Sequence, residues 1–416
     1  MSKETIILDQ ASAQVLPRCD FRIDYCAATQ QGATHAKNED AHLCRPAIGL
    51  FGIADGMGGH AAGDMASRVS LQCIERVLGG ADAAAVLERY VRQPDLVERR
   101  AVFALLKQAY AAANEAVLSA ALRHGGDKGM GSTLDVVLLV RDRAFFAHLG
   151  DSRAYLVRPM ATLQLTHDHA LYDSLQQTGK RISVKRWIKS PLARHIGSTK
   201  RQAVDTLFVD LQPGDKIILC TDGAYGALDD ECDFGALCEG SAKSVCTSLI
   251  EAAATQGLGD DATVVTLRIG DRFVARAADG GPRAEDIAVA LTSPLLCELA
   301  PSAALAALQA AVEVELDEGT RIDRAVASDR VAYIVLDGLV QLPSGRTLGA
   351  SGLLFPESLL DVPMRNELPT TVTRARLLRI RHDDFVEVCS HDPALAAGLY
   401  QRLARHLATL AASGSG

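Results

Sequence analysis

The chain has 416 residues, of which 48% are hydrophobic and 23% are charged. This length favours two or three domains, and the composition excludes wholesale disorder. The 43 basic and 51 acidic residues give a formal net charge of −8, so there is no electrostatic reason to expect nucleic acid or an anionic membrane as a partner.

The N-terminus and the cysteines bear on the location of the protein. Residues 1–10 carry Lys3, Glu4 and Asp9 around a short apolar run, which is unlike a signal peptide. No stretch of about 18 apolar residues is free of charges, so no membrane span is expected. The ten cysteines form no Cys-x-x-Cys pair and no cluster with zinc spacing. We therefore expect free thiols in a reducing compartment, the cytoplasm.

Residues 21–270 alternate short apolar runs with alanine-rich stretches, after an N-terminal segment of residues 1–20. Apolar runs of four to eight residues predict strands, and apolar residues at spacings of three and four predict helices. The predicted strands are residues 48–54, 133–140, 144–149, 216–220 and 263–269, and the predicted helices are residues 62–78 and 99–121. This mixture predicts a domain of the α+β class.

The pattern changes after residue 270. Residues 271–288 contain Gly280, Gly281 and Pro282 without periodicity, and they are the strongest candidate for a linker. Beyond them the sequence predicts a short helix near residues 294–311, several short strands separated by turn signals, and a helical stretch over residues 383–410. Residues 289–412 are therefore expected to form a second, smaller domain.

Acidic residues stand beside the ends of the predicted strands in the first domain. They are Glu39, Asp40, Asp55, Asp151, Asp222, Asp260 and Asp261. Carboxylates at the ends of buried strands are costly, because like charges repel and each group loses hydration. A pair of divalent cations would offset this cost, and oxygen ligands suit Mg²⁺ or Mn²⁺. One Asp-Gly pair alone is more often a simple turn, so it is the combination that predicts a metal site.

Seven short motifs occur in order between residues 37 and 263. They are Lys37-Asn38-Glu39-Asp40, Ile53-Ala54-Asp55-Gly56-Met57-Gly58-Gly59-His60, Gly129-Met130-Gly131-Ser132-Thr133, Gly150-Asp151-Ser152-Arg153-Ala154-Tyr155, Leu165-Thr166-His167-Asp168-His169, Thr221-Asp222-Gly223 and Asp260-Asp261-Ala262-Thr263. In this order they resemble the motif series of the metal-dependent type 2C protein phosphatases (the PPM family) in their bacterial form. The resemblance spans about residues 21 to 270.

The resemblance implies a four-layer α-β-β-α sandwich with two Mn²⁺ or Mg²⁺ ions at one end. It also implies a phosphoserine or phosphothreonine protein as substrate, a cognate Ser/Thr kinase pathway, and a water between the ions as the nucleophile. In the implied site, Asp55 bridges the ions, the Gly56 carbonyl binds one of them, Asp222 and Asp260 complete the pair of sites, Glu39 and Asp40 hold bound waters, and Asp151 with Asp222 is available for a third ion.

His35 departs from the family pattern, which places a phosphate-gripping arginine five residues before the aspartate of Asn-Glu-Asp. A histidine is only partly charged at pH 7 and cannot form a bidentate fork. We expect His35 to be either a weaker phosphate contact or a solvent-facing loop residue. The departure leaves open a second function, a pseudophosphatase that binds phosphoproteins without efficient turnover.

Residues 293–410 resemble a cyclic-nucleotide-binding domain through Val331–Gly338, Phe355-Pro356-Glu357 and Thr370–Ala375. The fold implied is a β-roll with flanking helices. In the segment Phe355-Pro356-Glu357, which contacts the ligand in the family, Pro356 lacks the backbone N–H donor. Glu367 or Leu368 stands where a phosphate-binding arginine is expected. We therefore expect a regulatory or docking domain, and homo-oligomerisation through it is one use of such a domain.

Overall fold

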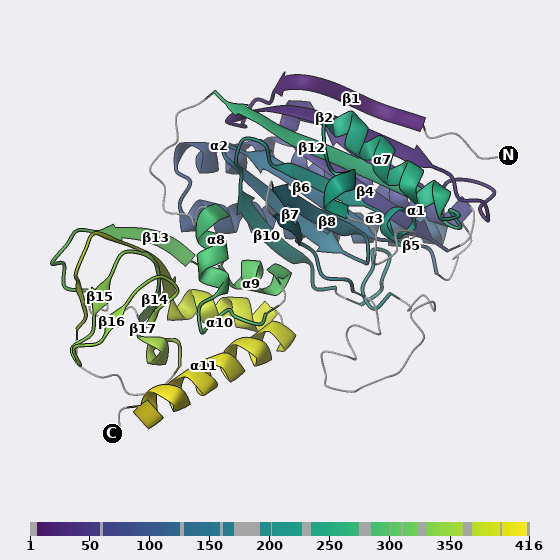
Figure 1. The fold of residues 1–416 in the computed structure, drawn as a ribbon. Helices are drawn as coiled ribbons and strands as arrows, with labels where there is room; N and C mark the ends of the chain where they lie inside the picture. Colours follow the sequence, from purple (N-terminus) through teal and green to yellow (C-terminus); the bar gives the residue numbers. More distant parts are fainter. Residues whose placement is uncertain are drawn as a thin grey trace. The chain divides into compact units, whose positions relative to one another are not determined.

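The computed structural model describes residues 6–58, 61–124, 129–158, 161–169, 192–200, 202–226, 234–273, 284–299, 301–308, 311–322, 330–360, 368–391 and 393–413. The chain divides into two compact units, Met1–Arg276 and Ala277–Gly416 (Figure 1). Among the described residues, no helix combines the length and the apolar character that a membrane crossing requires.

Two antiparallel sheets form the centre of the first unit (Figure 1). The first sheet has the order β1 (Ile6–Val15), β2 (Phe21–Gln30), β12 (Ala262–Arg272), β11 (Lys216–Cys220), β8 (Arg153–Arg158) and β9 (Ala161–Gln164). The second has the order β10 (Asp205–Asp210), β7 (Arg143–Leu149), β6 (Leu134–Val140), β4 (Leu50–Met57) and β3 (Asp40–Arg45), and β5 (Gly131–Ser132) pairs with β4. The sheets face each other, and the rings of Tyr25 in β2 and Phe51 in β4 lie 5.3 Å apart.

Helices cover the outer face of each sheet. The helices α1 (Ala61–Leu78), α2 (Ala81–Arg92) and α3 (Leu96–Arg123) share a buried apolar core with β4, β6 and β7. The helix α7 (Ala242–Thr255) packs on β2 and β12, and the short helices α5 (Asp222–Tyr225) and α6 (Phe234–Leu237) adjoin it. This is the four-layer α-β-β-α arrangement expected for residues 21–270.

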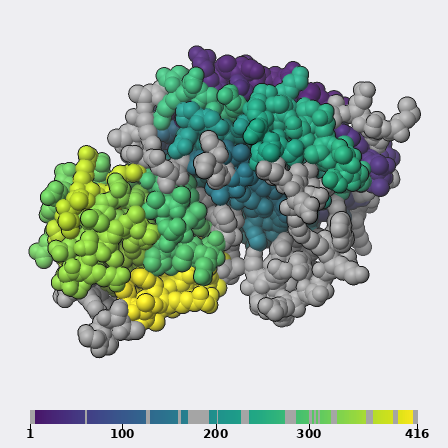
Figure 2. Space-filling model, viewed as in Figure 1, coloured from purple at the N-terminus to yellow at the C-terminus, as the bar shows by residue number. Residues whose placement is uncertain are grey.

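Local chemistry explains where the predicted bounds differ. The strand expected at residues 48–54 is β4, Leu50–Met57, because Pro46–Ile48 form a 3₁₀ turn that ends at Gly49 with φ of 72°. The strand β1 is not predicted from the sequence. It lies at the edge of the first sheet with most of its side chains exposed, and the purple N-terminal residues are at the surface in Figure 2. An edge strand of this kind lacks the apolar alternation on which strand prediction depends.

The second unit contains two small sheets, β13 (Ala311–Leu316), β19 (Ala375–Arg381), β14 (Val331–Asp337) and β17 (Leu353–Leu354) in one, and β16 (Thr347–Leu348), β15 (Val340–Gln341) and β18 (Thr370–Thr371) in the other. The 3₁₀ turn η2 (Pro356–Leu359) follows β17. The helix expected near residues 294–311 is present but shorter, as α9 (Pro301–Leu308), and a further helix, α8 (Ala284–Leu291), precedes it. The two helices flank a turn, and Ala311 begins a strand.

The C-terminal helical stretch is also two helices, α10 (His382–His391) and α11 (Pro393–Ser413). Pro393 is the first residue of α11, a position where proline loses no helical hydrogen bond. The linker expected at residues 271–288 begins within β12 and ends within α8, and residues 274–283 between them lie outside the described part of the chain.

Candidate metal centre

The predicted metal residues meet at the ends of strands from both sheets. Asp40 begins β3 and lies directly opposite Asp55 of β4. Asp222 is the first residue of α5, immediately after β11. Asp260 lies just before β12 and Asp151 follows β7. Strand pairing therefore brings carboxylates from five separate segments to one end of the sandwich.

The carboxylates influence one another strongly. Loss of hydration raises the pKa of Asp55 well above its usual range, and repulsion from Asp40, Asp222, Asp260 and Asp151 raises it further. Asp55 as a whole residue is nevertheless partly exposed to solvent. The five acids therefore form one electrostatic cluster whose negative charge is unfavourable without a cation.

Asp40 provides a direct test of whether a cation fits. Its side chain is 8% exposed, and Oδ2 accepts a hydrogen bond of 2.8 Å from the hydroxyl of Thr221. The other oxygen, Oδ1, is buried and has no hydrogen-bond partner among the described residues. Burial raises the pKa of Asp40 well above its usual range. A buried carboxylate oxygen without a donor fits a site for a hard cation and its water shell.

Two glycines let the metal residues come together. A Cβ added to Gly56 would overlap the carbonyl of Gly63 in the first turn of α1, and one added to Gly63 would overlap the carboxylate of Glu39. Glu39, Gly56 and the start of α1 are therefore in direct contact, with no space for a side chain at either glycine.

The backbone of Asp55 is fixed by two residues of the Gly-Ser-Thr motif. Its N–H donates to the hydroxyl of Thr133 over 2.8 Å, and its carbonyl accepts from the N–H of Thr133 and the hydroxyl of Ser132, both over 2.9 Å. On the other side of the site, the hydroxyl of Tyr225 in α5 donates to the carbonyl of Asp151 over 2.6 Å. These contacts position two candidate metal ligands, and no sequence motif indicates this role for Thr133 or Tyr225.

Asp261 is a site residue whose role its sequence motif does not reveal. It is 2% exposed and accepts backbone N–H bonds of 2.8 Å from Gly32 and from Glu39. It also lies 2.8 Å from Nδ1 of His35. Asp261 thus connects the loop of residues 31–39 to the start of β12. The motif marks Asp261 as acidic, but no local signal reveals contacts with residues more than 220 positions away.

His35 lies against this part of the site. Its Nδ1 is 3.4 Å from an oxygen of Asp260 as well as 2.8 Å from Asp261, and its side chain is 29% exposed. The hydrogen bond to Asp261 raises the pKa of His35. His35 is therefore a partly exposed member of the cluster and not a freely solvated loop residue.

A buried histidine pair lies behind Asp151. The rings of His148 and His169 contact each other with centroids 4.6 Å apart and planes tilted by 36°. His148 pairs with Asp135 over 2.8 Å, and His169 contacts Asp205 over 2.9 Å and accepts from the N–H of Gly150 over 3.2 Å. Burial lowers the pKa of His169 to about 4. Burial also opposes charging of His148, but the charge of Asp135 outweighs it and raises the pKa of His148 to about 9. Burial, with a smaller contribution from the charge of Asp168, raises the pKa of Asp135, and His148 opposes that rise.

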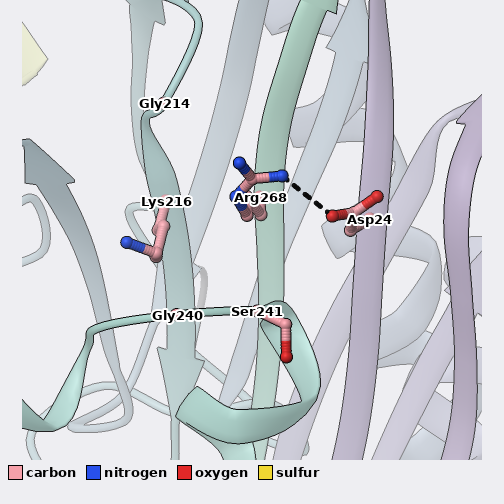
Figure 3. A pocket seen from close by; sticks show the side chains of 6 residues that line it. All are labelled: Asp24, Gly214, Lys216, Gly240, Ser241 and Arg268. Atoms are coloured by element: carbon pink, nitrogen blue, oxygen red, sulfur yellow. Dashed lines mark hydrogen bonds and ion pairs between the residues drawn. The ribbon is translucent and has the colours of Figure 1, made fainter.

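A surface pocket of about 450 Å³ lies away from these residues. It is lined by Asp24, Gly214, Lys216, Gly240, Ser241 and Arg268 (Figure 3). The acid in it, Asp24, is paired with Arg268 over 3.0 Å (Figure 3). Lys216 stands at the opposite end of β11 from Asp222, so this pocket is separate from the carboxylate cluster.

The first unit is similar to known proteins in sequence. Residues 31–255, more than half of the chain, match the family model for protein phosphatase 2C. The Serine/threonine protein phosphatase PstP of Mycobacterium tuberculosis is 29% identical over 262 residues, which is 62% of this chain and 47% of PstP. The Serine/threonine phosphatase stp of Listeria monocytogenes is 30% identical over 174 residues, 41% of this chain and 64% of its own. The chain thus spans about half the length of the first of these relatives.

Solved structures give the same result for the fold. A crystal structure of PstP from M. tuberculosis has a TM-score of 0.50 and 27% identity, and covers 60% of this chain and 99% of that chain. The catalytic domain of PstP in complex with 2 manganese ions has a TM-score of 0.50 and 28% identity, with the same coverage. The S. agalactiae serine/threonine phosphatase has a TM-score of 0.51 and 25% identity, and covers 59% of this chain and 99% of that chain.

Proposed function

Because this chain belongs to the protein phosphatase 2C family, we propose that it hydrolyses phosphoserine and phosphothreonine on proteins with the help of Mn²⁺ or Mg²⁺. The observation that carries this proposal is the electrostatic cluster around Asp55, in which Asp40, Asp151, Asp222 and Asp260 all raise its pKa. Such a cluster is unfavourable alone and fits a pair of divalent cations. The names of the relatives support the substrate class.

The donors around the cluster fit two hard cations, with room in the donor set for a third. The residues proposed to hold them are Asp55, Asp222 and Asp260, with the Gly56 carbonyl, with Glu39 and Asp40 acting through water, and with Asp151 and Asp222 for a third ion. When bound, the ions would neutralise the phosphate charge and acidify a water for attack on phosphorus.

Neighbouring residues hold the proposed metal ligands in position. Ser132 and Thr133 fix the backbone of Asp55, and Tyr225 fixes the carbonyl of Asp151. Asp55 as a whole residue is partly exposed to solvent. Since the Nδ1 edge of His35 faces Asp260 and Asp261, we place its phosphate contact at the other ring nitrogen, Nε2.

The proposed activity is tested by phosphate release from a phosphothreonine peptide with Mn²⁺, with Mg²⁺ and with a chelator. Turnover that needs either ion supports the proposal. Peptide binding without release of phosphate would instead identify the pseudophosphatase.

We propose that the second unit is a regulatory or docking domain resembling the cyclic-nucleotide-binding type, and that it acts by contact. Its described interior is filled by its own apolar side chains, among them Tyr333 and Phe355, whose rings lie 6.3 Å apart. Phe355 adopts φ of 53° immediately before Pro356, a backbone conformation that glycine tolerates better. Residues 361–367, which include Glu367, lie outside the described part.

The setting of the enzyme is also a proposal. We place it in the cytoplasm, because its nine described cysteines are all free. We also propose that it reverses the action of a Ser/Thr kinase. Self-association through the second unit is the proposed route to a homo-oligomer, and light scattering of the full chain measures it.

A further inference from the structure

We propose that His35 is a nitrogen ligand of the metal centre, sharing an ion with Asp260, and that it makes the centre prefer transition-metal ions over Mg²⁺. This inference rests on the metal site of the proposed function. It adds a ligand of a different chemical kind to a site otherwise built from oxygen atoms.

The geometry of three donors carries the inference. Nδ1 of His35 and one oxygen each from Asp260 and Asp261 all lie within 4.8 Å of one another. Nδ1 is 2.8 Å from the Asp261 oxygen and 3.4 Å from the Asp260 oxygen. With metal–ligand distances of about 2.1 Å, neighbouring atoms of an octahedral shell lie about 3 Å apart. At 3.4 Å, Nδ1 of His35 and the Asp260 oxygen are close to the separation of two ligands on one ion, and Asp261 holds the ring beside them.

The same donors are continuous with the main carboxylate cluster. Asp261, next to Asp260, accepts the N–H of Glu39 over 2.8 Å, and Glu39 adjoins Asp40, which lies directly opposite Asp55. His35 and Asp260 therefore belong to the same end of the sandwich as Asp40 and Asp55. The imidazole is a candidate member of the proposed centre and does not form an isolated surface site.

The loop that carries His35 is fastened to the loop before β12 at several points. The N–H of Ala33 donates to the carbonyl of Leu258 over 3.1 Å, and the hydroxyl of Thr34 bonds the carbonyl of Gly259. A Cβ added to Gly32 would overlap the backbone of Asp260. The side-chain amide of Gln31 also donates to the carbonyl of His35 over 2.7 Å. His35 is consequently held beside Asp260 by its backbone as well as by its ring.

The buried charge of Asp261 is compensated without His35. Asp261 accepts backbone N–H groups from Gly32 and Glu39, so its charge stays compensated when Nδ1 turns to a metal ion. If His35 only formed an ion pair with Asp261, its nitrogen would not be bonded to the metal ion, and spectroscopy of the bound ion distinguishes the two cases. Ligation through Nδ1 leaves the Nε2–H of the ring as a donor, which is compatible with the phosphate contact proposed above.

The expected consequence is metal selectivity. Imidazole nitrogen binds transition-metal ions, Mn²⁺ the most weakly of the first-row series, whereas Mg²⁺ prefers oxygen ligands and retains its waters. A centre with one imidazole should therefore bind Mn²⁺ more tightly than the same centre without it, and should bind Mg²⁺ about equally well.

The test uses pulsed electron paramagnetic resonance of the full chain loaded with Mn²⁺, which detects nitrogen bonded to the ion. We expect a nitrogen coupling in the natural protein that changes when histidine is labelled with ¹⁵N and disappears in His35→Gln. Titration of free Mn²⁺ should show affinity at least about tenfold lower in His35→Gln, with Mg²⁺ affinity changed by less than about threefold. The control is His124→Gln, at the exposed C-cap of α3, which should keep the coupling and the affinity.

A second variant guards against a folding defect. In His35→Asn an amide oxygen can stand near the place of Nδ1, so the ion should still bind while the nitrogen coupling is lost and the preference for Mn²⁺ falls. Mn²⁺ bound without nitrogen coupling in the natural protein, or unchanged Mn²⁺ affinity in His35→Gln, would overturn the inference and leave the proposed function standing. Failure of the natural protein to bind Mn²⁺ at all would overturn both.

Discussion

Asp40 and Asp55 are directly opposite each other on the neighbouring antiparallel strands β3 and β4. Like charges at directly opposite positions destabilise a sheet, and both groups have pKa values raised well above their usual range. Repulsion between Asp40 and Asp55 therefore lowers the stability of the metal-free protein, and a bound cation would remove this repulsion.

The first prediction follows from this pair. Asp55→Asn removes one charge without changing the shape of the side chain, so the metal-free protein should melt about 2–4 °C higher than the natural chain, an increase of about 1 kcal/mol in stability. The rise in melting temperature that Mn²⁺ produces in the natural chain should be lost in the variant. Thermal unfolding with and without Mn²⁺ measures both effects. A lower melting temperature of metal-free Asp55→Asn would show that the pair is not repulsive.

The second prediction concerns the contact between α1 and Glu39. Gly63→Ala places a Cβ against the carboxylate of Glu39, so the variant should fold but bind Mn²⁺ at least about tenfold more weakly. Calorimetric titration with Mn²⁺ measures the change. Gly259→Ala is the matched control, because a Cβ there meets nothing within 4 Å although the residue adjoins Asp260. Equal Mn²⁺ affinity in the two variants would contradict the placement of Glu39.

The third prediction is a pH dependence of stability from the buried histidine pair. His169 has a folded-state pKa of about 4, below its unfolded value of about 6.5, so the unfolded chain takes up the proton first as the pH falls. Stability should be lost between pH 6.5 and 4, by on the order of 3 kcal/mol. His148 has a folded-state pKa of about 9, so its contribution is complete below pH 6.5 and is lost as the pH rises toward 9.

Urea unfolding between pH 5 and 9 should therefore show this contribution at its greatest near pH 6.5. In His169→Asn, which retains an acceptor for the N–H of Gly150, the loss on the acid side should become shallower. In Asp135→Asn the loss on the alkaline side should become shallower. Variants whose pH profiles parallel that of the natural chain would rule out both assignments.

The fourth prediction concerns the second unit. Calorimetry of the full chain should detect no binding of cyclic AMP or cyclic GMP with a Kd below about 100 μM. A Kd of about 100 μM corresponds to a binding free energy of only about 5.5 kcal/mol. The reasons are Pro356, which has no N–H to donate, and an interior occupied by apolar side chains. Micromolar binding of either nucleotide would contradict the proposal that this unit acts by contact.

The sequence indicates which carboxylates adjoin strand ends, because Asp55, Asp222 and Asp260 each stand beside an apolar run that becomes a strand. It was insufficient for the contacts that organise them. Asp261 accepts from Gly32 across 229 positions, and Tyr225 reaches Asp151 across 74, so no local pattern reveals either contact. The strand β1 escaped prediction because an exposed edge strand needs no apolar face, and Gly63 escaped because its neighbour Glu39 becomes visible only once α1 is placed on β4.

The most direct test of the central claim is phosphate release from a phosphothreonine peptide by the full chain in Mn²⁺, compared with Asp55→Asn and Asp222→Asn. The natural chain should turn over and should stop when a chelator removes the metal. Each variant should be at least about 100-fold slower while retaining its circular dichroism spectrum. Asp24→Asn, in the separate pocket of Figure 3, should be as active as the natural chain. Metal-independent turnover, or full activity in Asp55→Asn, would contradict the account.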